Sequence, residues 1–131
     1  MANSKSDFRT PLSRATGLGS AKSGTEHFWH QRLTALANIP LGLFFTGLVV
    51  ALHDQPYDVV RASLASWPVA LGLLALIGSG LIHMRLGMQV IIEDYVHTEF
   101  TKIICLIANT FFTAAIGLGC VFAILKMAFS V

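Results

Sequence analysis

The strongest candidate for chemistry in this sequence is a histidine inside a long apolar segment. His83 lies within the run from about Trp67 to Ile92, at a depth where ionisable side chains are costly and often functional. A neutral imidazole can bind iron. Gly80 and Gly87 flank His83 at i−3 and i+4, so a flat macrocycle or a neighbouring helix could approach the ring. The spacing leaves two interpretations open: haem ligation and a hydrogen bond to another helix.

A second candidate group lies about three helical turns further along the same segment. Asp94 falls on the helix face of His83, and Tyr95 follows it, roughly 16 Å away along a helix axis. A tyrosine at this depth is commonly an interfacial anchor. It could instead donate a hydrogen bond to a quinone carbonyl, with the aspartate orienting it or relaying protons.

A third group lies where the first apolar segment begins. Arg32 precedes that segment, and His27 and His30 lie close before it. Arg32 could pair with a lipid phosphate, with a haem propionate or with groups near a quinone. The two histidines could serve the same carboxylates.

The elements that must position these residues are apolar and long. The chain has 131 residues, of which 54% are hydrophobic and 12% charged, about half the charge of a soluble domain. Each of three apolar segments is long enough to cross roughly 30 Å of hydrocarbon. The sequence therefore predicts an all-α integral membrane fold with spans at about 33–52, 67–92 and 103–129.

The remaining parts of the chain are polar. Residues 1–25 are expected to form a polar N-terminal arm, and residues 26–131 a three-helix anchor. Residues 26–32 are expected to extend the first helix, and 59–66 to form a short helical turn between the first two spans. A polar link over 93–102 is expected between the second and third.

The distribution of basic residues predicts the orientation. Five of the nine Lys and Arg residues lie in the first 32 positions, and the first loop and the carboxyl end hold one each. By the positive-inside rule the N-terminus lies in the cytoplasm, or in the matrix if the protein is mitochondrial, and the C-terminus on the opposite side, which is the periplasm for a bacterial inner membrane. His83 then lies in the inner half of its span, with Asp94 and Tyr95 at the inner surface.

Composition and motifs exclude several functions for this chain. The net charge of +2 suggests no nucleic-acid partner. Cys105 and Cys120 lie 15 residues apart in one apolar segment, about 22 Å along a helix, so they cannot bridge each other. The sequence has neither a glycine-rich dinucleotide motif nor a cysteine cluster, so we expect it to bind neither a flavin nor an iron–sulfur cluster.

These residues resemble a known family. The segment with His83, Gly87 and Asp94-Tyr95 resembles the second helix of the small hydrophobic membrane anchor subunit of succinate dehydrogenase, respiratory complex II. The run 26–35, which contains Arg32, resembles that subunit's entry into its first helix. The run 17–21 is similar to the alphaproteobacterial form, which favours a bacterial inner membrane over a mitochondrial transit peptide. The resemblance extends over essentially the whole chain.

The resemblance implies specific roles. His83 would be an axial ligand of a haem b shared with a second membrane anchor subunit. Tyr95 would donate a hydrogen bond to ubiquinone beside Asp94, and Arg32 would lie near the haem propionates and the quinone. Some relatives carry a histidine six residues before that arginine; here the position is Glu26, and His27 or His30 could replace it.

The resemblance also implies the complex and its partners. The expected function is that of a membrane anchor of succinate:ubiquinone oxidoreductase. A flavoprotein with FAD oxidises succinate, and an iron–sulfur subunit passes the electrons on; this chain is not catalytic alone. Two alternatives are an anchor of a quinol:fumarate reductase and a purely structural anchor without haem.

Overall fold

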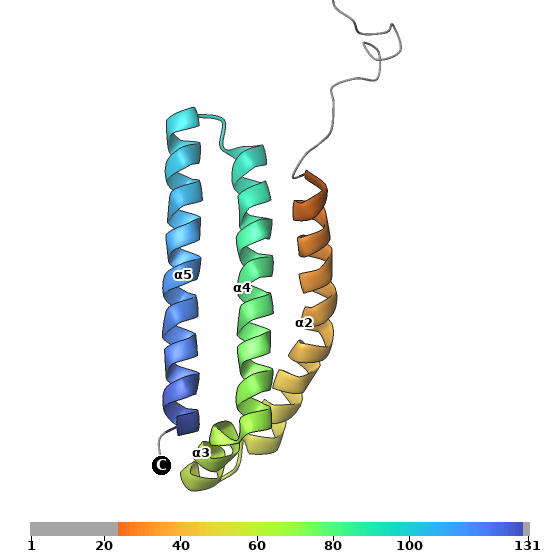
Figure 1. Ribbon diagram of the computed structural model, residues 1–131, viewed down its shortest axis with the longest axis vertical. Coiled ribbons are helices and arrows are strands. Elements are labelled where there is room, and N and C mark those ends of the chain that lie inside the picture. Colours follow the sequence, from red (N-terminus) through yellow and green to blue (C-terminus); the bar gives the residue numbers. More distant parts are fainter. Residues whose placement is uncertain (1–23, 130–131) are drawn as a thin grey trace, which may run out of the picture.

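Four helices account for nearly all of the part of the chain that the structure describes. The structure is a computed structural model and describes residues 24–129. The helices are α2 (Gly24–Leu52), α3 (Tyr57–Ala65), α4 (Trp67–Tyr95) and α5 (Glu99–Phe129). Figure 1 shows α2, α4 and α5 running alternately down, up and down, with the short α3 crossing beneath them. The all-α prediction is confirmed.

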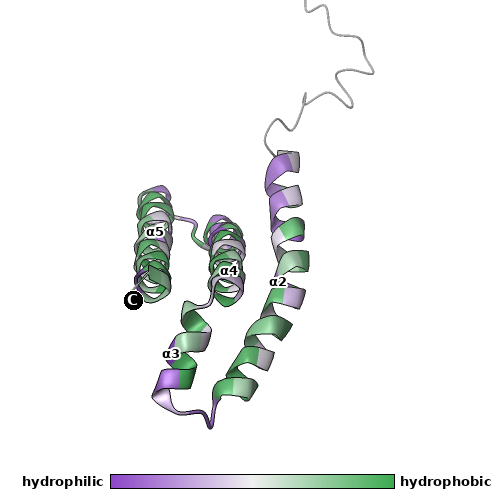
Figure 2. Cartoon of the chain, turned by 60° about the horizontal axis from the view of Figure 1, so that its bottom comes forward, coloured by the Kyte–Doolittle hydropathy of each residue, from purple (hydrophilic) through white to green (hydrophobic). Residues whose placement is uncertain are grey.

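The helix α4 is central to the bundle. It packs along both α2 and α5, whereas Figures 1 and 2 show α2 and α5 on different sides of it. The starts of α2 and α5 and the end of α4 lie together; we call this the N-terminal end of the bundle. The three groups of residues that the sequence singles out all lie on α2 and α4, towards this end.

Local sequence explains where the helices begin and end. Pro56 precedes α3 in an extended conformation, and Pro68 lies in the first turn of α4, where a proline loses no intrahelical hydrogen bond. Val96 ends α4 with an extended backbone. Pro40 lies inside α2, which nevertheless continues to Leu52.

Within the described residues, three helices are long and apolar enough to cross a membrane: Thr25–Leu52, Trp67–Tyr95 and Glu99–Phe129. Each is longer than the apolar segment that predicted it, because its first or last turns are polar. Figure 2 shows this at the start of α2, which is hydrophilic before it becomes apolar. Gly24 and Thr25, placed in the arm by composition, begin α2; the rest of the arm lies outside the described residues.

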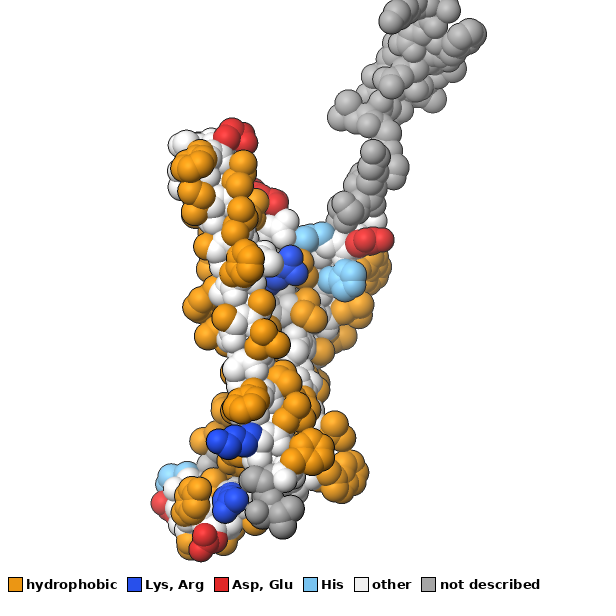
Figure 3. Space-filling model, turned by 60° about the vertical axis from the view of Figure 1, so that its left-hand side comes forward, with side chains coloured by type: hydrophobic (Ala, Val, Ile, Leu, Met, Phe, Trp, Pro, Cys, Tyr) orange, Lys and Arg blue, Asp and Glu red, His pale blue; other side chains and the backbone are white. Residues whose placement is uncertain are grey.

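The bundle buries little of its own apolar surface. Within residues 25–129, the buried hydrophobic side chains are Ala70, Leu73, Ile92 and Ile124. By contrast, Leu43, Phe111 and Leu118 are 70–73% exposed. Figure 3 shows that charged and histidine side chains gather towards the two ends, and that hydrophobic side chains cover much of the face between them. Such a surface is stable in lipid or against other apolar helices, so this is a multi-pass membrane protein.

Candidate functional site

His83 lies at the contact between α4 and α2. Its ring is half-buried, and its Nδ1 is 3.2 Å from the Thr34 hydroxyl oxygen and 3.3 Å from the Gln31 carbonyl oxygen. Both partners belong to α2. Of the two interpretations that the sequence left open, the interhelical hydrogen bond is therefore present.

The hydrogen-bond network assigns the proton on His83. The Thr34 hydroxyl donates within its own helix, to the carbonyl oxygens of His30 at 2.7 Å and Gln31 at 3.1 Å. A hydroxyl has one proton, so it has none left for His83. A carbonyl oxygen can only accept. Nδ1 must therefore carry the proton and donate it towards α2, which leaves Nε2 with a free lone pair.

This arrangement meets the requirements of a metal-binding histidine. A ligating imidazole typically donates its other ring N–H to a carbonyl or carboxylate, which fixes the tautomer and the ring orientation. Here Gln31 supplies such a carbonyl, and Nε2 is the nitrogen available to iron. Within residues 24–129, no group of three or more His, Cys, Asp or Glu side chains could hold a metal ion. That absence does not bear on a haem, whose ring supplies four of the ligands of its iron; what the structure shows is one imidazole, His83, with Nδ1 hydrogen-bonded to α2.

The contact with His83 is part of a longer row of polar residues on α2, which sequence reasoning missed. His27, Gln31, Thr34 and Asn38 are all half-buried on the face towards α4; we call them the polar stripe. Their spacing of i, i+4, i+7 and i+11 is the signal that could have revealed it. Ser79 on α4 also reaches the stripe, donating to the Thr34 carbonyl oxygen at 3.3 Å.

Three polar atoms of the stripe have no partner among the described residues. They are His27 Nε2, Gln31 Oε1 and Asn38 Oδ1, all buried. Near this end, a groove of about 510 Å³ separates α2 from α4. It is lined by Glu26, His27, His30, Leu86, Gln89, Val90 and Glu93. Buried polar atoms normally find a partner, and the groove beside His27 has room for water or for a polar group from outside the chain.

The glycines beside His83 differ in their surroundings. A Cβ on Gly87 would lie 3.2 Å from the Gln31 side-chain nitrogen, whereas a Cβ on Gly80 would meet nothing within 4 Å. Gly87 therefore leaves room for the end of the Gln31 side chain. Gly80 leaves open space and lines a groove between α4 and α5.

Arg32 and His30 lie on α2 next to the residues that contact His83, but their own side chains contact Phe28 and the Glu26 carbonyl oxygen. The Arg32 guanidinium is exposed and stacks 4.5 Å above the Phe28 ring. His30 donates from Nδ1 to the Glu26 carbonyl oxygen at 2.9 Å. Since that proton is engaged, His30 could donate a hydrogen bond to a carboxylate only as the doubly protonated imidazolium.

Asp94 and Tyr95 lie in the last turn of α4, and the structure does not bring them into contact with His83. Tyr95 is 76% exposed, and Asp94 is exposed as well. The exposed position of Tyr95 shows that the described part of this chain does not enclose the phenol. Any pocket built on Tyr95 must be completed by another molecule.

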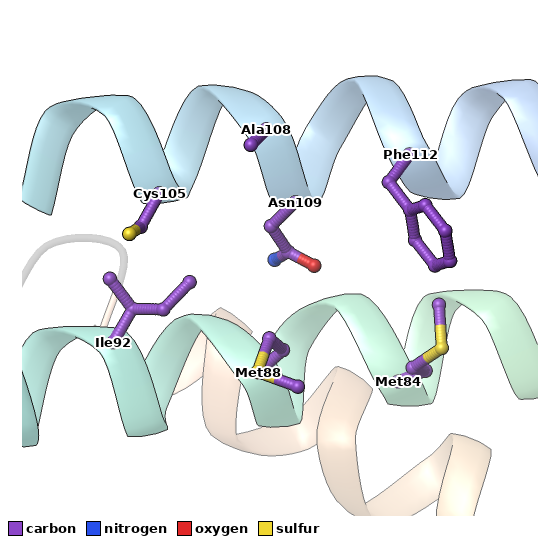
Figure 4. Close-up of a pocket in the computed structure, with 7 residues that line it drawn as sticks. All are labelled: Met84, Met88, Ile92, Cys105, Ala108, Asn109 and Phe112. Carbon is purple, nitrogen blue, oxygen red and sulfur yellow. The ribbon is translucent and has the colours of Figure 1, made fainter.

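A further groove between α4 and α5, nearer to the end of α4 than the one beside Gly80, is almost entirely apolar (Figure 4). It has a volume of about 430 Å³ and is lined by Met84, Met88, Ile92, Cys105, Ala108, Asn109 and Phe112. Its polar side chain, Asn109, donates to the Arg85 carbonyl oxygen at 3.0 Å. None of the candidate site residues lines this groove.

Three membrane-crossing helices with a half-buried histidine between the first two define a small helical membrane anchor. Comparison with known proteins makes the class specific: residues 6–124 match the family of succinate dehydrogenase/fumarate reductase transmembrane subunits, and the chain belongs to this family. The resemblance recognised in the sequence is thereby confirmed.

Curated relatives carry the same description over most of the chain. A succinate dehydrogenase hydrophobic membrane anchor subunit from Rickettsia bellii is 32% identical over 107 residues, which are 82% of this chain and 86% of that protein. The corresponding subunit of Paracoccus denitrificans is 28% identical over 120 residues, 92% of each chain. The membrane anchor subunit of Reclinomonas americana is 35% identical over 86 residues, which are 63% of this chain and 72% of that protein. No solved structure matches the chain.

Proposed function

We propose that this succinate dehydrogenase membrane anchor supplies one axial ligand of a haem b and part of a ubiquinone site. The observation that carries the proposal is the state of His83. Its Nδ1 proton is directed at α2, at 3.3 Å from the Gln31 carbonyl oxygen, so Nε2 is the ligand atom. A bound haem would supply one-electron redox chemistry near the quinone.

The residues of this chain would bind and orient, and the other subunits would complete the site. His83 would bind the iron through Nε2, and a second membrane anchor subunit would supply the other protein ligand. Arg32, whose exposed guanidinium stacks on Phe28, would bind a propionate or the quinone from another orientation of its side chain. His30 opens on the groove between α2 and α4 and would serve the same carboxylates when protonated.

The quinone part of the proposal rests on the last turn of α4. Tyr95 would donate a hydrogen bond to a ubiquinone carbonyl oxygen, and Asp94 beside it would orient the phenol or relay protons. The exposure of Tyr95 supports a pocket shared with an iron–sulfur subunit docked at the N-terminal end of the bundle. That subunit would receive its electrons from an FAD-containing flavoprotein that oxidises succinate.

The proposed location is the bacterial inner membrane, with the N-terminus in the cytoplasm and the C-terminus in the periplasm. This orientation places Tyr95 and the start of α2 on the side where the basic residues of the sequence gather.

A second candidate, a purely structural anchor, is favoured by one observation. The hydrogen bonds of His83 to Thr34 and Gln31 already satisfy one ring nitrogen within the chain. On that alternative His83 only joins two helices, an interaction worth about 0.6 kcal/mol on average in membrane bundles.

The His83→Ala substitution separates the two candidates in the purified complex. The proposal predicts loss of the b-type band from the reduced-minus-oxidised spectrum while the subunits still co-purify. His53→Ala is the matched control, because His53 is exposed at the other end of the bundle beside Asp54. A His83→Ala complex with an unchanged spectrum would sink the proposal and leave the structural anchor.

A further inference from the structure

We propose that Thr34 is a positioning residue, which acts with the Gln31 carbonyl oxygen to hold His83 in the tautomer that presents Nε2 to the iron. This inference rests on the proposed haem ligation and goes beyond it, because it assigns a role on α2 to a residue that need not contact the haem.

The first step concerns the Thr34 hydroxyl itself. It lies 2.7 Å from the His30 carbonyl oxygen and 3.1 Å from the Gln31 carbonyl oxygen, and both distances are typical of a donating hydroxyl. Its proton is thus held by the backbone of α2. The oxygen lone pairs that remain can only accept hydrogen bonds.

The second step concerns what His83 meets. Nδ1 lies between two oxygens, Thr34 Oγ1 at 3.2 Å and the Gln31 carbonyl oxygen at 3.3 Å. Both accept, so a protonated Nδ1 is stabilised and an unprotonated Nδ1 would face two lone pairs. The tautomer with the proton on Nε2, which could not bind iron through that atom, is therefore disfavoured.

The third step concerns the anchoring of Thr34. The Ser79 hydroxyl on α4 donates to the Thr34 carbonyl oxygen at 3.3 Å, four residues before His83 on the same helix. This hydrogen bond fixes the position of α2 along the axis of α4 near His83. The hydroxyl of Thr34 is thus held at a defined position relative to the ring.

The consequence for a bound haem follows from ligand chemistry. In a ligating imidazole, one ring nitrogen binds iron and the other carries a proton. A hydrogen bond donated by that N–H makes the imidazole a stronger electron donor, which favours the oxidised iron. Removing one of the two acceptors weakens that donation. The haem potential should therefore shift to a more positive value.

The test compares Thr34→Val with Thr34→Ser in the complete purified complex. Valine has nearly the shape of threonine but no hydroxyl, whereas serine keeps the hydroxyl. Thr46→Val is the matched control, because Thr46 also lies on α2 and also donates to the carbonyl four residues back, at 2.9 Å to Gly42, without a contact to His83. The readouts are the haem potential by redox titration and the electron paramagnetic resonance spectrum of the oxidised haem.

The proposal predicts a positive shift of the potential and an altered resonance spectrum in Thr34→Val, with Thr34→Ser and Thr46→Val close to the unmodified complex. Should the valine variant fail to accumulate, Thr34→Ala replaces it. An unchanged potential in the variants without the hydroxyl would overturn the proposal, as would a serine variant that shifts as far as the valine variant. Failure of the haem assignment itself is distinguishable, since His83→Ala would then retain the haem spectrum.

Discussion

Single residues carry the quinone hypothesis, and Tyr95 carries most of it. Its side chain is 76% exposed in the last turn of α4, so its removal costs this chain almost no packing. Tyr95→Phe keeps the ring and deletes only the hydroxyl. We expect this variant to lose ubiquinone reduction by roughly tenfold or more, on the scale of one hydrogen bond in a closed site.

The measurement for Tyr95→Phe has two arms. Succinate oxidation with an artificial acceptor that bypasses the membrane subunits should be normal, and ubiquinone reduction should fall. Tyr57→Phe is a suitable control, because Tyr57 is equally exposed at the start of α3. Normal ubiquinone reduction by the Tyr95 variant would show that the phenol does not bind the quinone.

At the same scale, the sequence predicts the depth of His83 in its span but not which residues it contacts. The apolar run and the flanking glycines predict that His83 faces either a haem or another helix. Its contacts with Gln31 and Thr34 join residues about 50 positions apart, and they depend on how α2 pairs with α4. Periodicity within one helix does not fix that pairing.

The bounds of α4 and α5 show why the apolar segments of the sequence predicted helices that were too short. Apolar segments predicted a span ending near Ile92 and a link over 93–102, but α4 continues to Tyr95 and α5 begins at Glu99. Only three residues, 96–98, separate the two helices. A helix ends where its backbone hydrogen bonds end, and the polar turns beyond the hydrocarbon keep theirs. At 31 residues, α5 is about 45 Å long, which exceeds the hydrocarbon thickness.

The packing of α2 against α4 depends on a small residue at Gly72. A Cβ there would lie 2.7 Å and 2.8 Å from two ring carbons of Phe44, and Phe44 packs against the small core of the bundle. Gly72→Ala should therefore destabilise the anchor by about 1–3 kcal/mol, the usual cost of overpacking. The measurement is the thermal stability of the detergent-solubilised complex.

The control for Gly72→Ala is Gly78→Ala on the same helix. A Cβ on Gly78 meets nothing within 4 Å, so alanine should be neutral or slightly stabilising there through its higher helix propensity. A Gly72→Ala complex that is as stable as Gly78→Ala would contradict this view of the interface.

For the whole molecule, the testable property is its orientation in the membrane. The three long helices alternate in direction, so the start of α2 and the end of α5 lie at opposite ends (Figure 1). Arg32 and Lys102 lie near the N-terminal end of the bundle, and the sequence adds four basic residues before position 24. Arg61 and Lys126 lie towards the other end.

Reporter fusions check this orientation directly. A phosphatase that is active only in the periplasm should be active when fused after Val131 and inactive when inserted within 96–98. The reverse pattern would invert the proposed topology and would place Tyr95 on the outer surface. The two fusions are made as separate proteins from the same chain, so each controls for the expression and activity of the reporter in the other.

The described part of the chain leaves apolar surface and some polar atoms without partners of its own. Few of its apolar side chains are buried among residues 25–129, and its polar stripe keeps three unpartnered atoms within the described residues. The fold class and the three spans follow from composition and length, because each span must be apolar and must satisfy its own backbone hydrogen bonds in lipid, as a helix does. The other half of the proposed site does not follow, because the proposal assigns it to other subunits.

The most direct test of the central claim is to change the identity of the proposed ligand with His83→Met. A methionine in place of one histidine ligand raises the potential of a haem. We predict that the haem of the His83→Met complex titrates at a clearly more positive potential, with an altered absorption spectrum. A haem with the same potential and spectrum as in the unmodified complex would show that His83 is not its ligand.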